Sequence, residues 1–360
     1  MCDPLVKKNK SISSSELGLR LLDWYDANRR DLPWRTGDPD PYHVWLSEIM
    51  LQQTIVATVI PYFGNFMARW PKVEDLAHSD LDRVLHAWQG LGYYARARNL
   101  HKCARVITDQ WGGQFPDTEE ELLKLPGIGP YTAGAIAAIA FNRPSTPVDG
   151  NIERVISRLH TLEKPAKTIK PEIAARAGEM MPAERPGDFA QAMMDLGATV
   201  CRPKSVDCPS CPWSEGCRAH AAGSWAQFPV KLPRKPKPTR HGIGFWLVRE
   251  DGAIYLRRRP EKGLLGGMTE IPSTDWREKP WSADEIAQFA PTVSDWREVP
   301  GKITHTFTHF HLHLSLVAGV AKPDEMGNGI WCQPDEFPDH ALPTVMKKLV
   351  RHGLNSVDAI

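Results

Sequence analysis

A proline-rich basic segment divides the chain into two parts with different hydrophobic patterns. Residues 229–240, PVKLPRKPKPTR, hold four prolines, five basic residues and no acid. This composition predicts an extended, solvated linker. The chain has 360 residues, which is enough for two domains that each bury a core. We therefore expect one domain over residues 1–228 and another over residues 241–360.

The part before the linker carries helix signals. Ser13 with Glu16, and Thr118 with Glu121, have the spacing of a capping box. Leucines recur at helical spacing after the first pair, and Pro126 ends the short apolar run after the second. The sequence therefore predicts an all-α first domain built from short helices.

The part after the linker reads as strands. GIGFWLVRE and AIYLRRR are joined at Asp251–Gly252, which is a strong hairpin signal. In TFTHFHLHLSLV, apolar and polar residues alternate, so that Phe310 and the following leucines face one way. The opposite face carries His309, His311 and His313, which indicate a solvated or DNA-facing strand, with a metal site as the alternative. We expect an α+β domain without internal repeats.

Charge and hydropathy limit the partners. Lys and Arg total 44 against 43 acids, so no global basic field indicates a nucleic-acid partner, and any such binding must use local patches. The polar start, MCDPLVKKNKSISSS, lacks the apolar core of a signal peptide, and no stretch approaches the roughly 20 apolar residues of a membrane span. We expect a soluble intracellular protein with no membrane partner.

Four of the seven cysteines lie within seventeen positions. Cys201, Cys208, Cys211 and Cys217 are separated by six, two and five residues, and seven cysteines are too few for a disulfide scaffold. Only one of these gaps is a tight zinc knuckle, whereas an iron–sulfur cluster accepts uneven spacing and takes four thiolates. The spacing favours a cluster, with a zinc site or free thiols as alternatives.

The stretch LPGIG before PYTAGAIAAIA predicts a turn that opens a helix. Gly127 and Gly129 can adopt positive φ because they have no side chain. Such a turn would leave backbone N–H groups at the start of the helix available for a phosphate. The small side chains that follow would let another helix or a DNA backbone come close. An ordinary glycine-bearing turn between helices remains the alternative.

Two carboxylates stand in contrasting surroundings. Glu48 lies among apolar residues in VWLSEIMLQQT, where burial would raise its pKa, and Asp149 precedes a helix in VDGNIERV. A protonated acid paired with an ionised carboxylate can cleave a glycosidic bond. A surface helix residue and a helix N-cap are the structural alternatives.

Several motifs occur in order along the first part of the chain: DLPWR, SEIMLQQT, GLGYYARARNL, LPGIGPYTAGAI, PVDGNIERV, FAQAMMDLGATVC and the four-cysteine spacing. Together they resemble one enzyme family, the MutY-type adenine DNA glycosylases of the helix-hairpin-helix superfamily. The likeness covers roughly residues 13–225, and the C-terminal part is similar, more weakly, to the Nudix-like domain of that family.

This resemblance implies a fold, a cofactor and a substrate. The fold would be a mainly α six-helix barrel packed on an iron–sulfur helical module, followed by an α+β Nudix-like lesion-recognition domain. The cofactor would be a 4Fe–4S cluster on the four cysteines. The substrate would be double-stranded DNA with adenine opposite 8-oxoguanine or guanine, handled by a monomer in the cytoplasm, nucleoid-associated in a bacterium.

The resemblance also implies residue roles. Glu48 would protonate the five-membered ring of a flipped adenine, and Asp149 would stabilise or briefly bond to the sugar cation. Tyr131 and Asn151 would hold that carboxylate and the departing sugar. The remaining implied contacts are Trp34 and Arg35 in the adenine pocket; Gln53 and Tyr93 as wedges; Arg96, Gly127 and Gly129 on DNA; and Thr308 and His309 at the lesion.

Three other functions remain open at this point. An endonuclease III-like glycosylase/lyase would carry a lysine where this chain has Tyr131. A Nudix hydrolase would need a metal-binding helix after GLLGGMTEIP, which is missing. A non-catalytic DNA-binding iron–sulfur protein would make both carboxylates incidental. The family loop also reads Phe-Ser-His where this chain has Phe307, Thr308 and His309, which puts the fit of the lesion contact in doubt.

Overall fold

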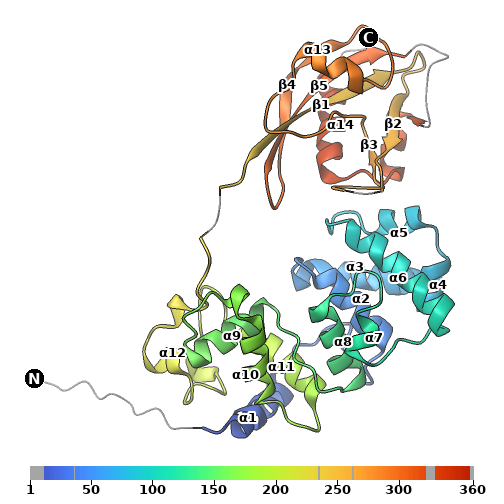
Figure 1. Cartoon of the computed structure of the whole chain (residues 1–360). Coiled ribbons are helices and arrows are strands. Elements are labelled where there is room, and N and C mark those ends of the chain that lie inside the picture. The colour runs from blue at the N-terminus through green and yellow to red at the C-terminus, as the bar shows by residue number, and fades with distance from the viewer. Residues whose placement is uncertain (1–11, 36, 234–235, 262, 322–328, 357–360) are drawn as a thin grey trace, which may run out of the picture. The chain divides into compact units, whose positions relative to one another are not determined.

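The computed structural model describes residues 12–35, 37–233, 236–261, 263–321 and 329–356. The polar start of the chain, and Arg234 and Lys235 of the predicted linker, lie outside the described residues. The chain divides into two compact units, residues 1–78 with 99–233 and residues 79–98 with 234–360 (Figure 1). The division at residue 233 lies inside the predicted linker, whereas the placement of residues 79–98 in the second unit was not predicted.

The first unit is built from helices. Ser13 is the N-cap of α1, where its side chain accepts a hydrogen bond from Glu16 N at 3.2 Å. Thr118 caps α7 in the same way, so both predicted helix starts are confirmed. The helices are α1 (Ser14–Asn28), α2 (Pro41–Leu51), α3 (Val56–Arg69), α4 (Val73–His78), α6 (Ala95–Trp111, entered from the second unit), α7 (Glu119–Leu122), α8 (Pro130–Phe141), α9 (Gly150–His160), α10 (Lys170–Gly178), α11 (Pro186–Thr199) and α12 (Arg218–Ala221).

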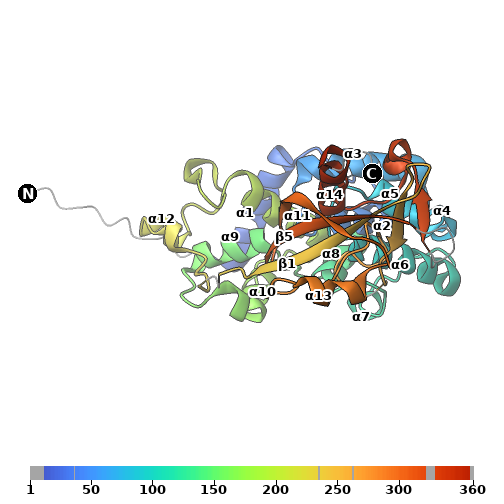
Figure 2. The same cartoon turned by 90° about the horizontal axis from the view of Figure 1, so that it is seen from above.

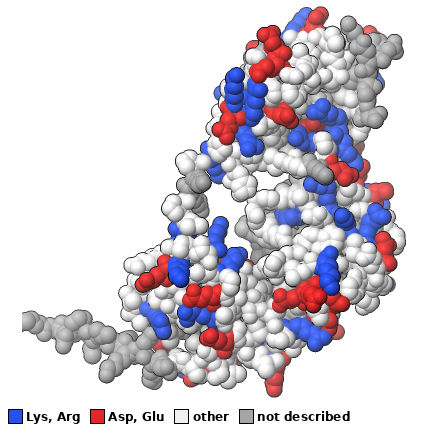
Figure 3. Space-filling view, in the orientation of Figure 1, with Lys and Arg blue, Asp and Glu red and all other residues white. Residues whose placement is uncertain are grey.

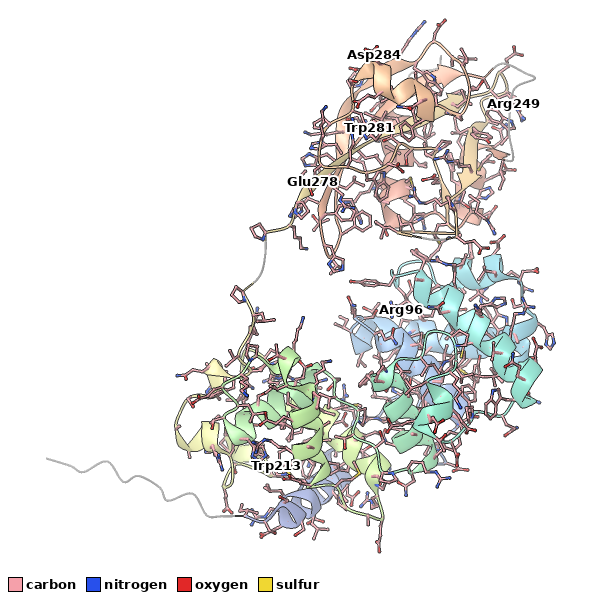
Figure 4. All side chains as sticks on the ribbon, in the orientation of Figure 1. Arg96, Trp213, Arg249, Glu278, Trp281 and Asp284 are labelled. Atoms are coloured by element: carbon pink, nitrogen blue, oxygen red, sulfur yellow. The ribbon has the colours of Figure 1, made fainter. Side chains whose placement is uncertain are left out.

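One core joins α1, α9, α10 and α11, which Figures 1 and 2 show as a single group of helices. Its fully buried members include Leu21, Ile152 and Phe189. Trp213, labelled in Figure 4, lies in the cysteine-bearing loop, and its Nε1 donates to Leu17 O at 2.8 Å. Because Trp213 is also in this core, the loop is anchored to α1.

The small residues of α8 let other helices approach closely, as the sequence predicted. Five of them, Ala133, Gly134, Ala135, Ala137 and Ala138, are buried, and α8 packs on α2 and α11. At the contact with α11, a Cβ added to Gly187 would lie only 2.4 Å from Ala138 O. This packing sets α2, α8, α9 and α11 around one site.

The second unit contains a six-stranded sheet in the order β3-β2-β1-β5-β4, with β6 also paired to β2. Its strands are β1 (Thr239–Val248), β2 (Ile254–Arg258), β3 (Thr269–Glu270), β4 (Arg297–Thr306), β5 (His311–Val320) and β6 (Ile330–Cys332). β1 runs parallel to β5, from Thr239 opposite His311 to Val248 opposite Val320. The helices of this unit include α5 (Leu81–Ala87), α13 (Ala283–Ile286) and α14 (Thr344–Ser356). Figure 2 shows α13 and α14 on opposite faces of the sheet.

Both strand predictions are confirmed. β1 and β2 pair antiparallel around Asp251–Gly252, and Gly252 has a φ of 83°. Along β5, Leu312, Leu314 and Leu316 are buried in the core of this unit, where Met346 and Leu349 of α14 join them. The period-two pattern therefore decides which face of β5 meets α14.

Figure 3 shows basic and acidic side chains interspersed on the face in view. No helix of the described residues has the length and apolar character needed to span a bilayer.

Alanine at Gly187 tests the close approach of α8 and α11. The added methyl would push against the backbone of Ala138, so we expect Gly187→Ala to lower the free energy of unfolding by about 1–3 kcal/mol. Gly64→Ala is the matched control, because Gly64 is an exposed position of α3 and nothing lies within 4 Å of its added Cβ. Alanine there should raise helix stability by up to about 1 kcal/mol. Urea unfolding of both variants makes the comparison, and equal stability of Gly187→Ala and wild type would contradict this packing.

Candidate active site and cysteine cavity

Glu48 and Tyr131 meet although they lie 83 residues apart in the chain. Glu48 is on the buried side of α2 and is only 6% exposed, which rules out a surface helix residue. Tyr131 is the second residue of α8, and its Oη donates to Glu48 Oε2 at 2.8 Å. The packing of α2 on α8 therefore brings together two residues that the sequence singled out.

Burial dominates the electrostatics of Glu48. Burial, the largest cause, and the nearby charge of Asp149 raise the pKa of Glu48, while the hydrogen bond from Tyr131 and the charge of Arg35 lower it, and the net value is about 7. Burial and the Glu48 carboxyl also raise the pKa of Tyr131 well above its usual value, so the phenol stays neutral and donates. Near neutral pH, Glu48 is thus able to hold a proton and to release it.

Asp149 is partly buried as well, but it lies at the N-terminus of α9 and accepts backbone N–H groups. It is the N-cap, and its carboxylate accepts from Asn151 N at 2.9 Å, Asn151 Nδ2 at 2.7 Å and Ile152 N at 2.8 Å. Burial raises the pKa of Asp149, and these N–H donors oppose that shift because they stabilise the ionised form. The N-cap interpretation is confirmed, and the same residue still belongs to the site with Glu48.

Arg154 is a site residue that sequence reasoning missed. Its Nη2 donates to Asn151 Oδ1 at 2.8 Å and to Gly197 O at 2.7 Å, and its Nε donates to Cys201 O at 2.8 Å. The guanidinium therefore fixes the amide of Asn151 so that its Nδ2 points to Asp149. The only signal in the sequence is an arginine one helical turn after Asn151, on the same face of α9.

A cavity lies beside Glu48, and it contains both residues of the predicted base pocket. Its lining is Arg30, Leu32, Trp34, Arg35, Val44, Ser47, Glu48, Leu51, Val56, Ile139, Gln191 and Met194. The Trp34 ring is buried against Phe63, with centroids 5.4 Å apart. The wall of this cavity therefore combines apolar and guanidinium groups next to a protonatable carboxyl.

An ion cluster that the sequence did not predict supports this cavity. Asp195 of α11 is fully buried, and Arg35 donates to it twice, at 2.7 Å and 2.9 Å. Arg30 Nε also donates to it at 2.7 Å. Burial alone would raise the pKa of Asp195. The guanidiniums of Arg35 and Arg30 nevertheless hold this pKa below its ordinary value. An acid inside the apolar run FAQAMMDLG was the available signal, because such a group needs a cationic partner.

The glycine turn before α8 is confirmed at one position and corrected at the other. Gly127 has a φ of 77°, and a Cβ there would lie 2.6 Å from Asn99 Cβ. At Gly129 the expected positive φ is wrong. This residue is the N-cap of α8, with extended backbone and a φ of −100°. Nothing lies within 4 Å of an added Cβ at Gly129, so that position is open.

Both predicted wedge residues have left-handed backbone. Gln53, which follows α2, has a φ of 59°, and Tyr93 has a φ of 47°. In the described residues, only five non-glycine residues have positive φ, which bulky side chains adopt rarely. Both side chains are exposed. Such conformations often occur at sites that hold a ligand.

The other predicted DNA contacts fall in the second unit. Arg96 donates from Nη2 to Leu91 O at 3.0 Å and to Gly92 O at 3.3 Å, so its guanidinium is engaged within its own segment, and its contact with phosphate stays a prediction. Thr308 and His309 are exposed in the turn between β4 and β5. Within this unit, the hydroxyl groups of Tyr93 and Thr308 share a hydrogen bond.

The four clustered cysteines line one cavity in the first unit. The cavity is bounded by Arg158, Val200, Cys201, Val206, Asp207, Cys208, Cys211, Ser214, Cys217, His220 and Trp225. Arg158 Nη1 donates to Cys201 Sγ at 3.2 Å, and burial raises the pKa of Cys211 to about 12. Among the described side chains of His, Cys, Asp and Glu, no group of three or more is arranged to hold a single metal ion, which also applies to the histidines of β5.

Comparison with known proteins matches a helical and a C-terminal part of the chain to two families. Residues 46–178 match the HhH-GPD superfamily of base excision DNA repair proteins, and residues 244–352 match the NUDIX domain. Adenine DNA glycosylase of Homo sapiens is 36% identical over 92% of this chain and 72% of its own length. The chain belongs to the adenine DNA glycosylase family.

Two further similarities agree with this assignment. Adenine DNA glycosylase of Buchnera aphidicola (subsp. Schizaphis graminum) is 31% identical over 92% of this chain and 96% of its own length. The structure of a thermostable thymine-DNA glycosylase aligns with a TM-score of 0.53 and 28% identity, over 58% of this chain and 97% of that one. The chain is therefore a DNA glycosylase of base-excision repair, with the helix-hairpin-helix and Nudix-like parts that the sequence predicted.

The raised pKa of Glu48 has a consequence for stability. Between its unfolded value of 4.5 and the folded value of about 7, the folded state binds more protons than the unfolded state, so stability falls as pH rises through this window. Above about pH 7, the raised pKa of Glu48 lowers the free energy of unfolding by about 3 kcal/mol. Glutamine removes the titrating group and can still accept from Tyr131.

We therefore expect Glu48→Gln to gain stability relative to wild type as pH rises from about 5 to about 8. Chemical unfolding at both pH values measures this difference. Glu120→Gln is the control, because the side chain of Glu120 is 88% exposed. A difference between Glu48→Gln and wild type that does not change with pH would contradict the raised pKa.

Proposed function

We propose that this glycosylase removes adenine paired with 8-oxoguanine or guanine in duplex DNA, and that it leaves the abasic strand uncut. The observation that carries this proposal is the buried Glu48 carboxyl, with a pKa of about 7, beside the carboxylate of Asp149 and a cavity lined by Trp34 and Arg35. The target base must leave the stack to reach this pocket, because its glycosidic bond is inaccessible within the duplex.

The first chemical step is protonation of the base. Glu48 transfers its proton to the five-membered ring of adenine, and the electron pair of the bond between the sugar and the base leaves with adenine. Tyr131 donates to the carboxylate that remains on Glu48, at the 2.8 Å contact already present. The phenol therefore stabilises the ionised product of the transfer.

The second step is stabilisation of the sugar. The loss of adenine leaves positive charge on the sugar, which the carboxylate of Asp149 offsets or captures. Asn151 and the N-terminus of α9 hold that carboxylate. Water then adds to the sugar, and the proton it releases restores the acid form of Glu48.

Two features support the finer parts of the proposal. Tyr131 occupies the place where a lyase of this superfamily carries lysine, and a neutral phenol cannot form an imine with the sugar. The exposed Gln53 and Tyr93 have the left-handed backbone of preformed turns and would enter the space vacated by the flipped base. Thr308 and His309 would read the base opposite, and the open position at Gly129 would admit the DNA backbone.

We also propose that the four cysteines hold a 4Fe–4S cluster. The donor set fits, since four thiols line one cavity and Arg158 contacts Cys201 Sγ. A 4Fe–4S cluster takes four cysteine thiolates, which is the donor set at this cavity. When bound, the cluster would cross-link the loop that follows α11, and the guanidinium of Arg158 would offset thiolate charge.

The test of the proposed function is base release under single-turnover conditions. Duplexes carry adenine opposite 8-oxoguanine, guanine or thymine, and chromatography identifies the released base. We expect adenine release from the first two and an intact abasic strand on a denaturing gel after borohydride treatment. Glu48→Gln should bind these duplexes and lose at least about a hundredfold in rate, because its amide has no proton to transfer.

The exposed Glu120→Gln again serves as the control and should match wild type. Release of adenine by Glu48→Gln at the wild-type rate would show that the acid is assigned wrongly. Borohydride trapping of the wild-type protein on DNA would instead overturn only the monofunctional part.

Iron content tests the cluster independently of excision. Anaerobically purified protein should be brown and contain about four iron atoms per chain. Cys208→Ser should lose iron, whereas Cys332→Ala should keep it, because Cys332 is buried in the second unit. Stoichiometric zinc without visible absorbance would contradict the cluster.

A further inference from the structure

The segment Gly90–Tyr93 forms a tight left-handed turn. Three of its four residues have positive φ, with values of 102° at Gly90, 69° at Gly92 and 47° at Tyr93. Glycine adopts this conformation readily, but tyrosine does so at a cost, because its Cβ crowds the backbone. A bulky residue keeps such a conformation only where its surroundings impose it.

Two side chains impose it here by binding the carbonyls of the turn. Arg96, at the start of α6, donates from Nη2 to Leu91 O at 3.0 Å and to Gly92 O at 3.3 Å. Trp88 Nε1 donates to the same Gly92 O at 3.0 Å. The Tyr93 carbonyl in turn accepts from Arg96 N at 2.8 Å. These bonds satisfy the carbonyls and fix the path of the backbone into Tyr93.

The guanidinium of Arg96 also contacts two aromatic rings. Its Cζ lies 5.2 Å from the centroid of the buried Trp88 ring and 5.6 Å from the centroid of the Tyr93 ring. Figure 4 labels Arg96 beside α6. Burial lowers the pKa of Arg96 to about 10, so the side chain still carries its charge at neutral pH. The cation therefore connects the fixed Trp88 to the exposed Tyr93.

We propose that Arg96 is a positioning residue that holds Tyr93 in its left-handed conformation before DNA arrives. This inference rests on the wedge role given to Tyr93 in the proposed function. Preorganisation matters because a wedge that must first be ordered loses part of its binding free energy to that ordering. A planar guanidinium can stack on an aromatic ring and donate to two carbonyls at the same time. A lysine ammonium keeps the charge but lacks this planar geometry.

This role differs from a phosphate contact by its coupling to Tyr93. A phosphate contact would act independently of the ring at position 93, so the effects of removing each would multiply. A positioning residue acts through the ring, so its removal should matter little once the ring is gone. The double-mutant cycle of Arg96→Met and Tyr93→Ala separates the two.

The experiment measures two quantities on a duplex with adenine opposite 8-oxoguanine. One is the single-turnover rate of adenine release, and the other is the fluorescence of 2-aminopurine placed beside the mispaired base, which rises when the wedge unstacks it. We expect Arg96→Met to lower the rate roughly tenfold, which corresponds to about 1.4 kcal/mol, and to reduce the fluorescence change as well. In the Tyr93→Ala background, the same substitution should change the rate by less than about twofold.

Controls separate positioning from folding and from net charge. Arg105→Met removes a positive charge from an exposed position of the same helix, and we expect it to match wild type. Arg96→Lys should recover part of the loss, and it replaces Arg96→Met in the cycle if that variant does not fold. Additive losses in the cycle would overturn the positioning role alone. Wild-type rate and fluorescence in Tyr93→Ala would overturn both the wedge assignment and this inference.

Discussion

The site depends on one carboxyl that is kept out of water. Glu48 lies among buried apolar residues of α2, and Tyr131 donates a hydrogen bond to its carboxyl at 2.8 Å. Burial favours its neutral form and the phenol favours its charged form, and together they leave its pKa at about 7. The small residues of α8 are needed for this arrangement, because they let α8 pack on α2 and bring Tyr131 to the carboxyl.

The second carboxyl, Asp149, differs from Glu48 in the number of hydrogen-bond donors that it accepts. Asp149 accepts three N–H groups at the N-terminus of α9, so its charge is compensated by directed donors. Arg154 orients one of those donors through Asn151 and reaches Cys201 O, at the edge of the cysteine cavity. The same helix therefore supplies the carboxylate and connects it to the loop that carries the cysteines. A shift of that loop would be transmitted to Asn151 through the hydrogen bonds of Arg154.

Local patterns predicted the elements, and long-range contacts were harder to foresee. The caps at Ser13 and Thr118, the hairpin at Asp251–Gly252 and the alternation of β5 all depend on near neighbours, and the structure has them. The prediction of positive φ at Gly129 was wrong, because a glycine pattern does not reveal which glycine needs positive φ. Asp195 was missed because its partners Arg30 and Arg35 lie 160 or more residues away. Arg154 was missed because, besides the nearby Asn151, it binds Gly197 and Cys201, which lie 43 and 47 residues away. The pair Glu48 and Asp149 was identified by apolar context and by resemblance, and neither gave the distance between them.

The pH dependence of single-turnover adenine release is the most direct test of the protonated acid. For wild type, the rate should be highest in the acidic range and fall as pH rises through about 7, because only protonated Glu48 can transfer a proton. Tyr131→Phe removes the donor that lowers the pKa of Glu48, so the same fall should move to higher pH. A wild-type rate that does not change between about pH 6 and about pH 8, or a fall that moves to lower pH in Tyr131→Phe, would contradict the account.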